Sequence, residues 1–145
     1  MVESVTRELI QRLQAVLEPH SEVLDAYLFG SYARGDAAAH SDVDVALFVS
    51  NEFLHRPGYG ISAEISADLQ RALGRSEVDV VLLNNAPPVL YHSVLKDGVR
   101  LLSRDLAATT SREGMALSRY CDYVPQLRII EEAHRERIAQ GRLGR

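Results

Sequence analysis

The chain has 145 residues, of which 46% are hydrophobic and 25% charged, and this composition is typical of one globular domain. Its formal net charge of −4 argues against an extended nucleic-acid-binding surface, because neutralising phosphates requires clustered Lys and Arg. Cys121 is the only cysteine, which excludes an internal disulfide and a cysteine-rich zinc site. No apolar run reaches about 18 residues and the N-terminus has no apolar signal core, so we expect a soluble, cytoplasmic protein outside the membrane.

The first half of the chain alternates between helical and strand patterns. Apolar residues at helical spacing predict a helix over Val2–Leu17. A strand over Val23–Phe29 then leads into a short helical turn, Ser31–Gly35. A polar loop, Asp36–Ser41, precedes the clearest strand, Asp42–Val49, whose alternating pattern puts the valines on a core face and both aspartates on the other face.

The second half continues this alternation after a break that contains Pro57 and Gly58. The patterns predict a helix over Ile61–Leu73, a strand over Glu77–Leu83, a helix over Pro87–Lys96 and a short strand over Val99–Ser103. The remainder, from about Leu106 to Gln140, is helix-biased and interrupted at Pro125. We therefore expect a layered α+β fold, with a core over residues 1–104 and a C-terminal helical arm over residues 105–145 that packs on the core or docks a partner.

The dipeptide Gly30-Ser31 follows the Val23–Phe29 strand and opens the next helical turn. Glycine allows a phosphate to approach the backbone closely, and the first N–H groups of a helical turn are unpaired donors. The Ser31 hydroxyl would add one more hydrogen bond to a phosphate oxygen. Gly-Ser is also among the commonest turn dipeptides, so this pair alone does not separate a phosphate site from an ordinary turn.

Asp42 and Asp44 lie two residues apart on a strand, with their Cα atoms about 6.5 Å apart, and their side chains therefore point the same way. Two such carboxylates are able to converge on divalent cations, and without a cation they would repel each other. Aspartate is depleted in strands, and local conflicts of this kind are expected mainly at functional sites. The alternative is an edge strand that uses charge to prevent aggregation.

Asp79 lies in a second apolar strand, and beside the first acidic strand it would place a third carboxylate on the same face. Three acids on neighbouring strands are a suitable ligand set for two Mg²⁺ ions, because hard cations prefer oxygen ligands. Taken alone, Asp79 is better explained as an exposed residue at a sheet edge, and its weight comes from Asp42 and Asp44.

The spacing of these residues resembles a known signature, Gly-Ser followed after about ten residues by Asp-x-Asp, and here ten residues separate Ser31 from Asp42. The segment Gly30–Gly35 followed by Ser41–Asp44 is similar to that of the DNA polymerase β-type nucleotidyltransferase superfamily. Within it, the chain most resembles the MNT-type minimal nucleotidyltransferases, over roughly Val23–Ser103. The resemblance implies a nucleotidyltransferase fold, a small mixed β-sheet flanked by helices, with the C-terminal arm in addition.

The resemblance also implies roles for the acidic residues. Asp42 and Asp44 would be ligands of the Mg²⁺ ion that carries ATP. Asp79 would complete a second Mg²⁺ site and help to activate the acceptor.

The phosphate-binding residues follow from the same resemblance. Gly30 and Ser31 would bind the β- and γ-phosphates of ATP. Arg34 would neutralise charge on the triphosphate or the leaving pyrophosphate, although a surface arginine in a turn is an equal alternative. Ser41 and Asp36 are weaker candidates.

MNT-type proteins resemble the antitoxin half of toxin–antitoxin pairs whose partner is a HEPN ribonuclease. The resemblance implies transfer of AMP from ATP to a tyrosine hydroxyl of that toxin, where the bulky charged group would obstruct RNA. Two alternatives stay open: nucleotidyl transfer to a small molecule such as an aminoglycoside, and a non-catalytic antitoxin that acts by stoichiometric binding. The sequence leaves the base preference, the number of nucleotides added and the oligomeric state undecided, a homo-oligomer included.

Overall fold

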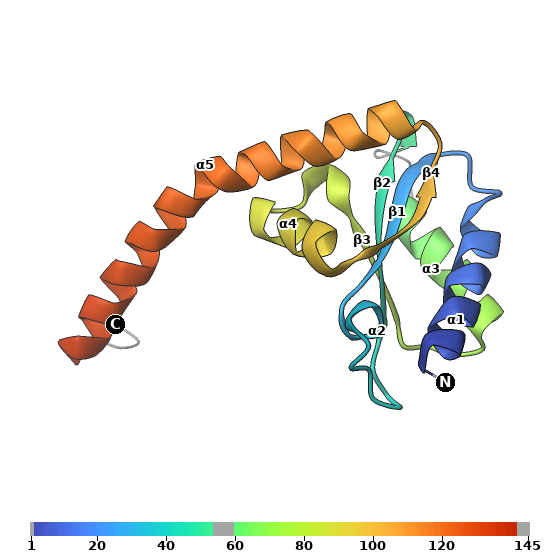
Figure 1. Ribbon diagram of the computed structural model, residues 1–145, viewed down its shortest axis with the longest axis horizontal. Coiled ribbons are helices and arrows are strands. Elements are labelled where there is room, and N and C mark those ends of the chain that lie inside the picture. Colours follow the sequence, from blue (N-terminus) through green and yellow to red (C-terminus); the bar gives the residue numbers. More distant parts are fainter. Residues whose placement is uncertain (1, 54–59, 142–145) are drawn as a thin grey trace.

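The computed structural model describes residues 2–53 and 60–141, and it contains the predicted alternation of helices and strands (Figure 1). The elements in chain order are α1 (Val2–Leu17), β1 (Val23–Phe29), α2 (Ser31–Arg34), β2 (Val43–Val49), α3 (Gly60–Leu73), β3 (Val78–Leu82), α4 (Pro88–Asp97), β4 (Val99–Ser103) and α5 (Leu106–Ala139). Short 3₁₀ turns, Asn51–Phe53 and Leu83–Asn85, follow β2 and β3. The predicted break at Pro57 and Gly58 lies outside the described residues.

The strands form one mixed sheet in the order β3-β2-β1-β4. Strand β1 is antiparallel to both β2 and β4, whereas β2 and β3 are parallel. The parallel pair requires a crossover, which α3 supplies between β2 and β3. The predicted fold class, a small mixed sheet flanked by helices, is confirmed.

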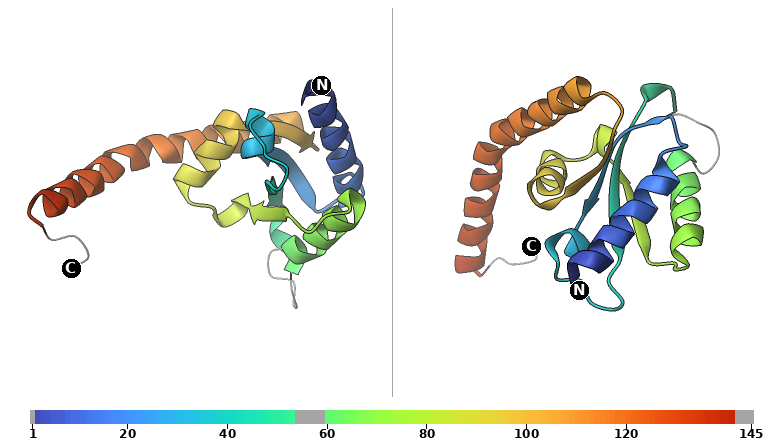
Figure 2. Two further views of the ribbon diagram at one scale, coloured as in Figure 1. Left: turned by 90° about the horizontal axis from the view of Figure 1, so that it is seen from below. Right: turned by 45° about the vertical axis from the view of Figure 1, so that its right-hand side comes forward.

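Helices cover both faces of the sheet, as Figure 2 shows from two sides. On one face, apolar residues of α1 and α3 pack against the alternating valines and leucine of β2: Leu13, Leu17, Ile61, Ile65, Leu69, Val43, Val45, Leu47 and Val49. On the other face, α4 and α5 cover a smaller cluster: Tyr27, Ala46, Leu83, Tyr91, Val94 and Ala116. The predicted alternation along β2 is therefore confirmed, and a central strand that is apolar along most of its length carries a half-buried aspartate near its beginning.

Helix α5 begins with a side-chain cap, because the Asp105 carboxylate accepts hydrogen bonds from the N–H groups of Ala107 (3.1 Å) and Ala108 (3.3 Å). The expected interruption at Pro125 was wrong, since the helix runs through this residue to Ala139. Proline removes one backbone donor and crowds the preceding turn, which bends a helix without necessarily ending it. Figure 1 shows that α5 changes direction along its length and that its second half projects from the core.

A buried ion pair fastens the first half of α5 to the sheet. Asp25 of β1 is 0% exposed, and the Arg112 guanidinium donates to both of its oxygens, from Nε at 2.7 Å and from Nη2 at 2.8 Å. The Thr109 hydroxyl donates to the same carboxylate at 2.6 Å. Because α5 is held in this way, the arm begins at a fixed place on the core.

Among the described residues, none of the helices combines the length and the apolar character that crossing a bilayer requires.

Candidate active site

The three predicted acidic residues come together at one end of the parallel strand pair. Asp44 of β2 and Asp79 of β3 are register partners, and Asp42 lies two residues before Asp44, directly ahead of β2. Paired residues of parallel strands project from the same face, and the strands lie about 4.8 Å apart. Asp42 and Asp79 are exposed, whereas Asp44 is half-buried. The sheet therefore presents three carboxylates on one face at an edge that solvent reaches.

Among the three carboxylates, Asp44 is the one whose ionised form is destabilised by its surroundings. Partial burial raises the pKa of the Asp44 carboxyl above its ordinary value, and repulsion by Asp79 and then by Asp42 raises it further. Arg34 lowers the pKa of Asp44, but this effect is smaller than the three that raise it. A cation placed among these carboxylates would relieve both the desolvation and the repulsion.

Gly30 joins the predicted phosphate-binding turn to this acidic face. Its φ of +74° lies in a region that favours glycine. A Cβ atom added there would lie closer than 3.0 Å to Asp44 Oδ2, because Phe29, the residue before Gly30, is the register partner of Asp44. A side chain at this position would therefore displace the Asp44 carboxylate from its place beside Gly30. The structure brings Gly30, Ser31 and Asp44 to one place, as the motif predicts.

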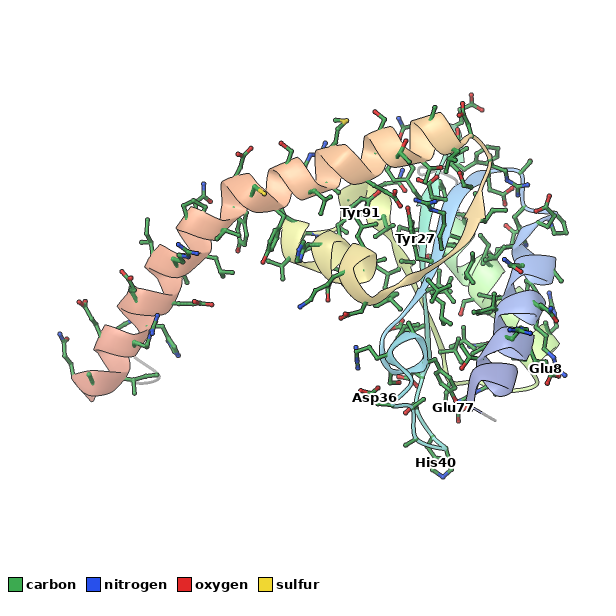
Figure 3. All side chains as sticks on the ribbon, viewed as in Figure 1. Glu8, Tyr27, Asp36, His40, Glu77 and Tyr91 are labelled. Carbon is green, nitrogen blue, oxygen red and sulfur yellow. The ribbon has the colours of Figure 1, made fainter. Side chains whose placement is uncertain are left out.

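Arg34 and the two weaker candidates occupy the edge of this site. The Arg34 side chain is 47% exposed and its Nε atom lies 3.4 Å from Asp36 Oδ2, so it remains free to turn towards a phosphate. The Ser41 hydroxyl accepts a hydrogen bond from the Ala38 N–H at 2.8 Å and therefore stabilises the loop that contains both residues. Figure 3 shows Asp36 near the end of the molecule where His40 and Glu77 lie. Of these candidates, Arg34 is the one with a charge that already acts on Asp44.

The donor set suits Mg²⁺, since carboxylate oxygens are the ligands that hard divalent cations prefer. Within residues 2–53 and 60–141, however, no three His, Cys, Asp or Glu side chains are already closed around one metal-sized position. The carboxylates are thus neighbours, but they do not form a complete metal-binding site by themselves. Magnesium that arrives with a nucleotide normally brings phosphate and water oxygens as further ligands, so a partly formed protein site is what this ion requires.

One further residue, which is not part of the motif, contacts both halves of it. Arg75, which follows α3, hydrogen-bonds to Tyr32 of α2 and to the carbonyl oxygen of Ser41. Nothing in the sequence pattern singled it out, because an arginine after a helix-ending glycine is common on protein surfaces.

A mixed four-stranded sheet that presents a Gly-Ser turn beside three aspartates at one end of two adjoining strands defines a nucleotidyltransferase domain. Residues 11–107 match the family described as polymerase beta, nucleotidyltransferase, and the chain belongs to this family. The resemblance drawn from the motif is confirmed, and the prediction of a nucleotidyltransferase is confirmed at the level of the family.

Two curated relatives are similar in sequence. The protein adenylyltransferase MntA of Shewanella oneidensis is 31% identical over 75 residues, which are 52% of this chain and 50% of that protein. The chain therefore spans half the length of this relative. A putative protein adenylyltransferase of Methanocaldococcus jannaschii is 30% identical over 95 residues, which are 66% of this chain and 96% of that protein.

Solved structures share the fold. A toxin–antitoxin complex with AMP-PNP contains a chain with a TM-score of 0.70 at 24% identity, covering 86% of this chain and 97% of that chain. A chain of the MntA–HepT toxin–antitoxin complex has a TM-score of 0.66 at 21% identity, covering 88% and 97%. A chain of the tri-AMPylated Shewanella oneidensis HEPN toxin in complex with MNT antitoxin has a TM-score of 0.62 at 22% identity, covering 92% and 98%.

Proposed function

We propose that this protein transfers AMP from ATP to a tyrosine hydroxyl of a HEPN ribonuclease toxin and acts as the antitoxin of that toxin. The observation that carries this proposal is the position of Asp44, opposite Asp79 and against Gly30, which puts the acidic face directly beside the Gly30-Ser31 turn. The names of the two relatives, both protein adenylyltransferases, support the reaction. The toxin–antitoxin complexes of the same fold support the partner.

The reaction needs three things from the chain: a grip on the triphosphate, a place for the acceptor and charge balance. The acceptor oxygen bonds to the α-phosphorus of ATP as its proton passes to Asp79 or to water, while the bond from that phosphorus to the bridging oxygen breaks and pyrophosphate departs. Gly30 and Ser31 would hold the β- and γ-phosphates, and Arg34 would offset charge on the departing pyrophosphate. Asp42 and Asp44 would hold Mg²⁺ with the nucleotide.

Asp79 is placed for the acceptor side. It is exposed on the edge strand β3, so a hydroxyl group from another molecule reaches it without passing through the core. Asp79 would help to hold a second Mg²⁺ and orient the attacking hydroxyl. Bound Mg²⁺ supplies charge neutralisation on the phosphates and lowers the pKa of a coordinated hydroxyl.

The projecting half of α5 is our candidate surface for the toxin. The first half of α5 already packs in a helical pair with α4, where the Tyr120 and His92 rings stack at 3.6 Å between centroids. The apolar stripe of α5 that includes Tyr120 continues as Tyr123, Leu127 and Ile130 at helical spacing. Every residue from Arg128 to Gly141 is exposed. An apolar stripe that continues from a helix–helix contact suits a helix of a partner protein.

A labelling experiment tests the reaction directly. The purified toxin is incubated with this protein, Mg²⁺ and ATP that carries radioactive phosphorus at either the α- or the γ-position. Nucleotidyl transfer labels the toxin only from the α-position, and phosphodiesterase treatment should release AMP. Label from the γ-position would instead indicate a phosphoryl transfer and contradict the proposal.

The same experiment separates catalysis from docking. If the toxin takes no label and the Asp42→Asn/Asp44→Asn variant still neutralises it fully in cells, the protein acts by stoichiometric binding. If the toxin takes no label but an added aminoglycoside does, transfer to a small molecule is the function.

A further inference from the structure

Arg75 makes two short hydrogen bonds to the two parts of the nucleotidyltransferase motif. Its Nη1 donates to the Tyr32 hydroxyl at 2.7 Å, and its Nη2 donates to the carbonyl oxygen of Ser41 at 2.6 Å. The guanidinium carbon also lies 5.6 Å from the centroid of the Tyr32 ring, within the range of a cation–π contact. One planar side chain thus holds an aromatic residue and a loop carbonyl at the same time.

The two acceptors are direct chain neighbours of the proposed ligand-binding residues. Tyr32 follows Ser31 in α2, so its position sets that of the phosphate-binding turn. Ser41 precedes Asp42, and its carbonyl belongs to the peptide unit that enters the acidic strand. The turn and the loop are joined through the chain only by the stretch between α2 and β2. Arg75 joins them across space.

Arg75 is itself well held. Gly74, with a φ of +66°, ends α3 immediately before it, and the backbone N–H of Arg75 donates to the Gln70 carbonyl at 3.2 Å. Its Nε lies 3.5 Å from the Glu77 carboxylate, and its side chain is only 24% exposed. Val43 N–H also donates to the Glu77 carbonyl at 2.9 Å. Together with the hydrogen bond from Arg75 to Ser41, this gives two hydrogen bonds between the segment that carries Arg75 and the start of β2.

We propose that Arg75 is a positioning residue for nucleotide binding, which fixes the separation between the Gly30-Ser31 turn and the Asp42/Asp44 carboxylates. This inference rests on the proposed function, because it assumes that both groups bind one Mg²⁺–nucleotide. Phosphates held by the turn and a cation held by the carboxylates must lie at a set distance. A guanidinium fork with one donor on each side maintains such a distance better than a flexible point charge.

The test measures the affinity for Mg²⁺–AMP-PNP by calorimetry, together with the melting temperature, for Arg75→Met and Arg75→Lys. Residues that orient ligand-binding groups typically change affinity or activity by about 10- to 100-fold when they are replaced, and we expect a loss of that size for Arg75→Met. Arg75→Lys should restore part of it, because an ammonium group reaches one acceptor. Tyr32→Phe removes the hydroxyl acceptor alone, and its effect should be largely absent when Arg75 is already Met.

The matched control is Arg71→Met, which removes an arginine from the last turn of α3. The Arg71 side chain is 75% exposed. Its ion-pair partner within the described residues is Asp68. This variant should bind Mg²⁺–AMP-PNP as the wild type does.

The outcomes are distinct. Unchanged nucleotide affinity in Arg75→Met, or a loss of melting temperature with full affinity, would overturn the positioning role and leave the proposed function intact. Wild-type protein that does not bind Mg²⁺–AMP-PNP at all would overturn the proposed function and this inference with it. Reduced affinity in both Arg75→Met and Arg71→Met would point to a general effect of α3 and contradict a specific role of Arg75.

Discussion

Asp44 on β2 and Asp79 on β3 are register partners in the only parallel pair of the described sheet, and both carboxylates project from the same face. Strand β2 is central and β3 lies at the edge, so one acid is half-buried and the other exposed. The half-buried acid has the raised pKa. The fold therefore accepts an unfavourable charge at the place where we propose that a cation binds.

Replacing Asp44 by Asn should stabilise the protein without metal while abolishing nucleotide transfer. The folded-state pKa of Asp44 is raised above its ordinary 3.8, so the ionised carboxyl destabilises the fold at neutral pH, and this penalty fades as the pH falls through the raised pKa. In EDTA, Asp44→Asn should melt above the wild type at pH 7, with a smaller difference near pH 4. Thermal unfolding at both pH values measures this. A lower melting temperature for Asp44→Asn at pH 7 would contradict the assignment, and the exposed Asp122→Asn serves as control.

Gly30→Ala should reduce AMP transfer by more than the strain in its backbone conformation alone would explain. At Gly30, with a φ of +74° and a ψ of −154°, a non-glycine residue costs about 1–3 kcal/mol of backbone strain, and the new Cβ would also collide with the Asp44 carboxylate. Displacement of reacting groups by about 1 Å is able to cost 100-fold in rate, and we expect at least that loss of AMP transfer. Gly60→Ala is the control, since Gly60 has a φ of +79° and no described atom within 4 Å of an added Cβ. Equal losses of activity in both variants would argue against a specific Gly30–Asp44 contact.

Arg112→Met should destabilise the fold strongly, because it leaves the fully buried Asp25 carboxylate without its bidentate partner. Breaking a buried ion pair on one side typically costs about 3–5 kcal/mol. Arg12→Met breaks an exposed pair with Glu8, whose side chains are 54% and 65% exposed, and should cost less than about 1 kcal/mol. Urea unfolding of both variants gives the comparison. A small effect of Arg112→Met would mean that the other contacts of α5, including the hydrogen bond from Thr109 to Asp25, hold the helix without this ion pair.

Much of the fold followed from local patterns. The alternation along Asp42–Val49 has a period of two residues, which fixes both the core face and the acidic face, and the outcome matched it. The sequence also predicted that Asp79 shares a face with the first acidic strand, but its register opposite Asp44 is visible only in the structure. The alternation within each strand depends on neighbours in the chain, and a sequence shows such neighbours directly.

The contacts that could not be predicted join distant segments. Asp25 with Arg112, and Arg75 with Tyr32 and Ser41, are brought together only by the packing of helices on the sheet. No periodicity carries that information. Pro125 is the opposite case, because its local preference against helix was clear but the surrounding helical segment continued through it.

The projecting half of α5 gives a prediction about the partner. Ile130 is 55% exposed, so Ile130→Gln should leave the melting temperature unchanged yet weaken the complex with the toxin about tenfold or more. Arg128→Gln, about 200° away around the helix, should affect neither quantity. Calorimetric titration of each variant with the toxin measures the affinity. Equal affinities for wild type and Ile130→Gln would place the toxin contact elsewhere.

The most direct test of the central claim is the intact mass of the toxin after incubation with ATP, Mg²⁺ and this protein. Our account predicts that the toxin gains the mass of one or more AMP units with the wild type and none with Asp42→Asn/Asp44→Asn, although that variant stays folded. A toxin whose mass is unchanged by the wild type, under conditions in which Mg²⁺–AMP-PNP binds, would contradict it.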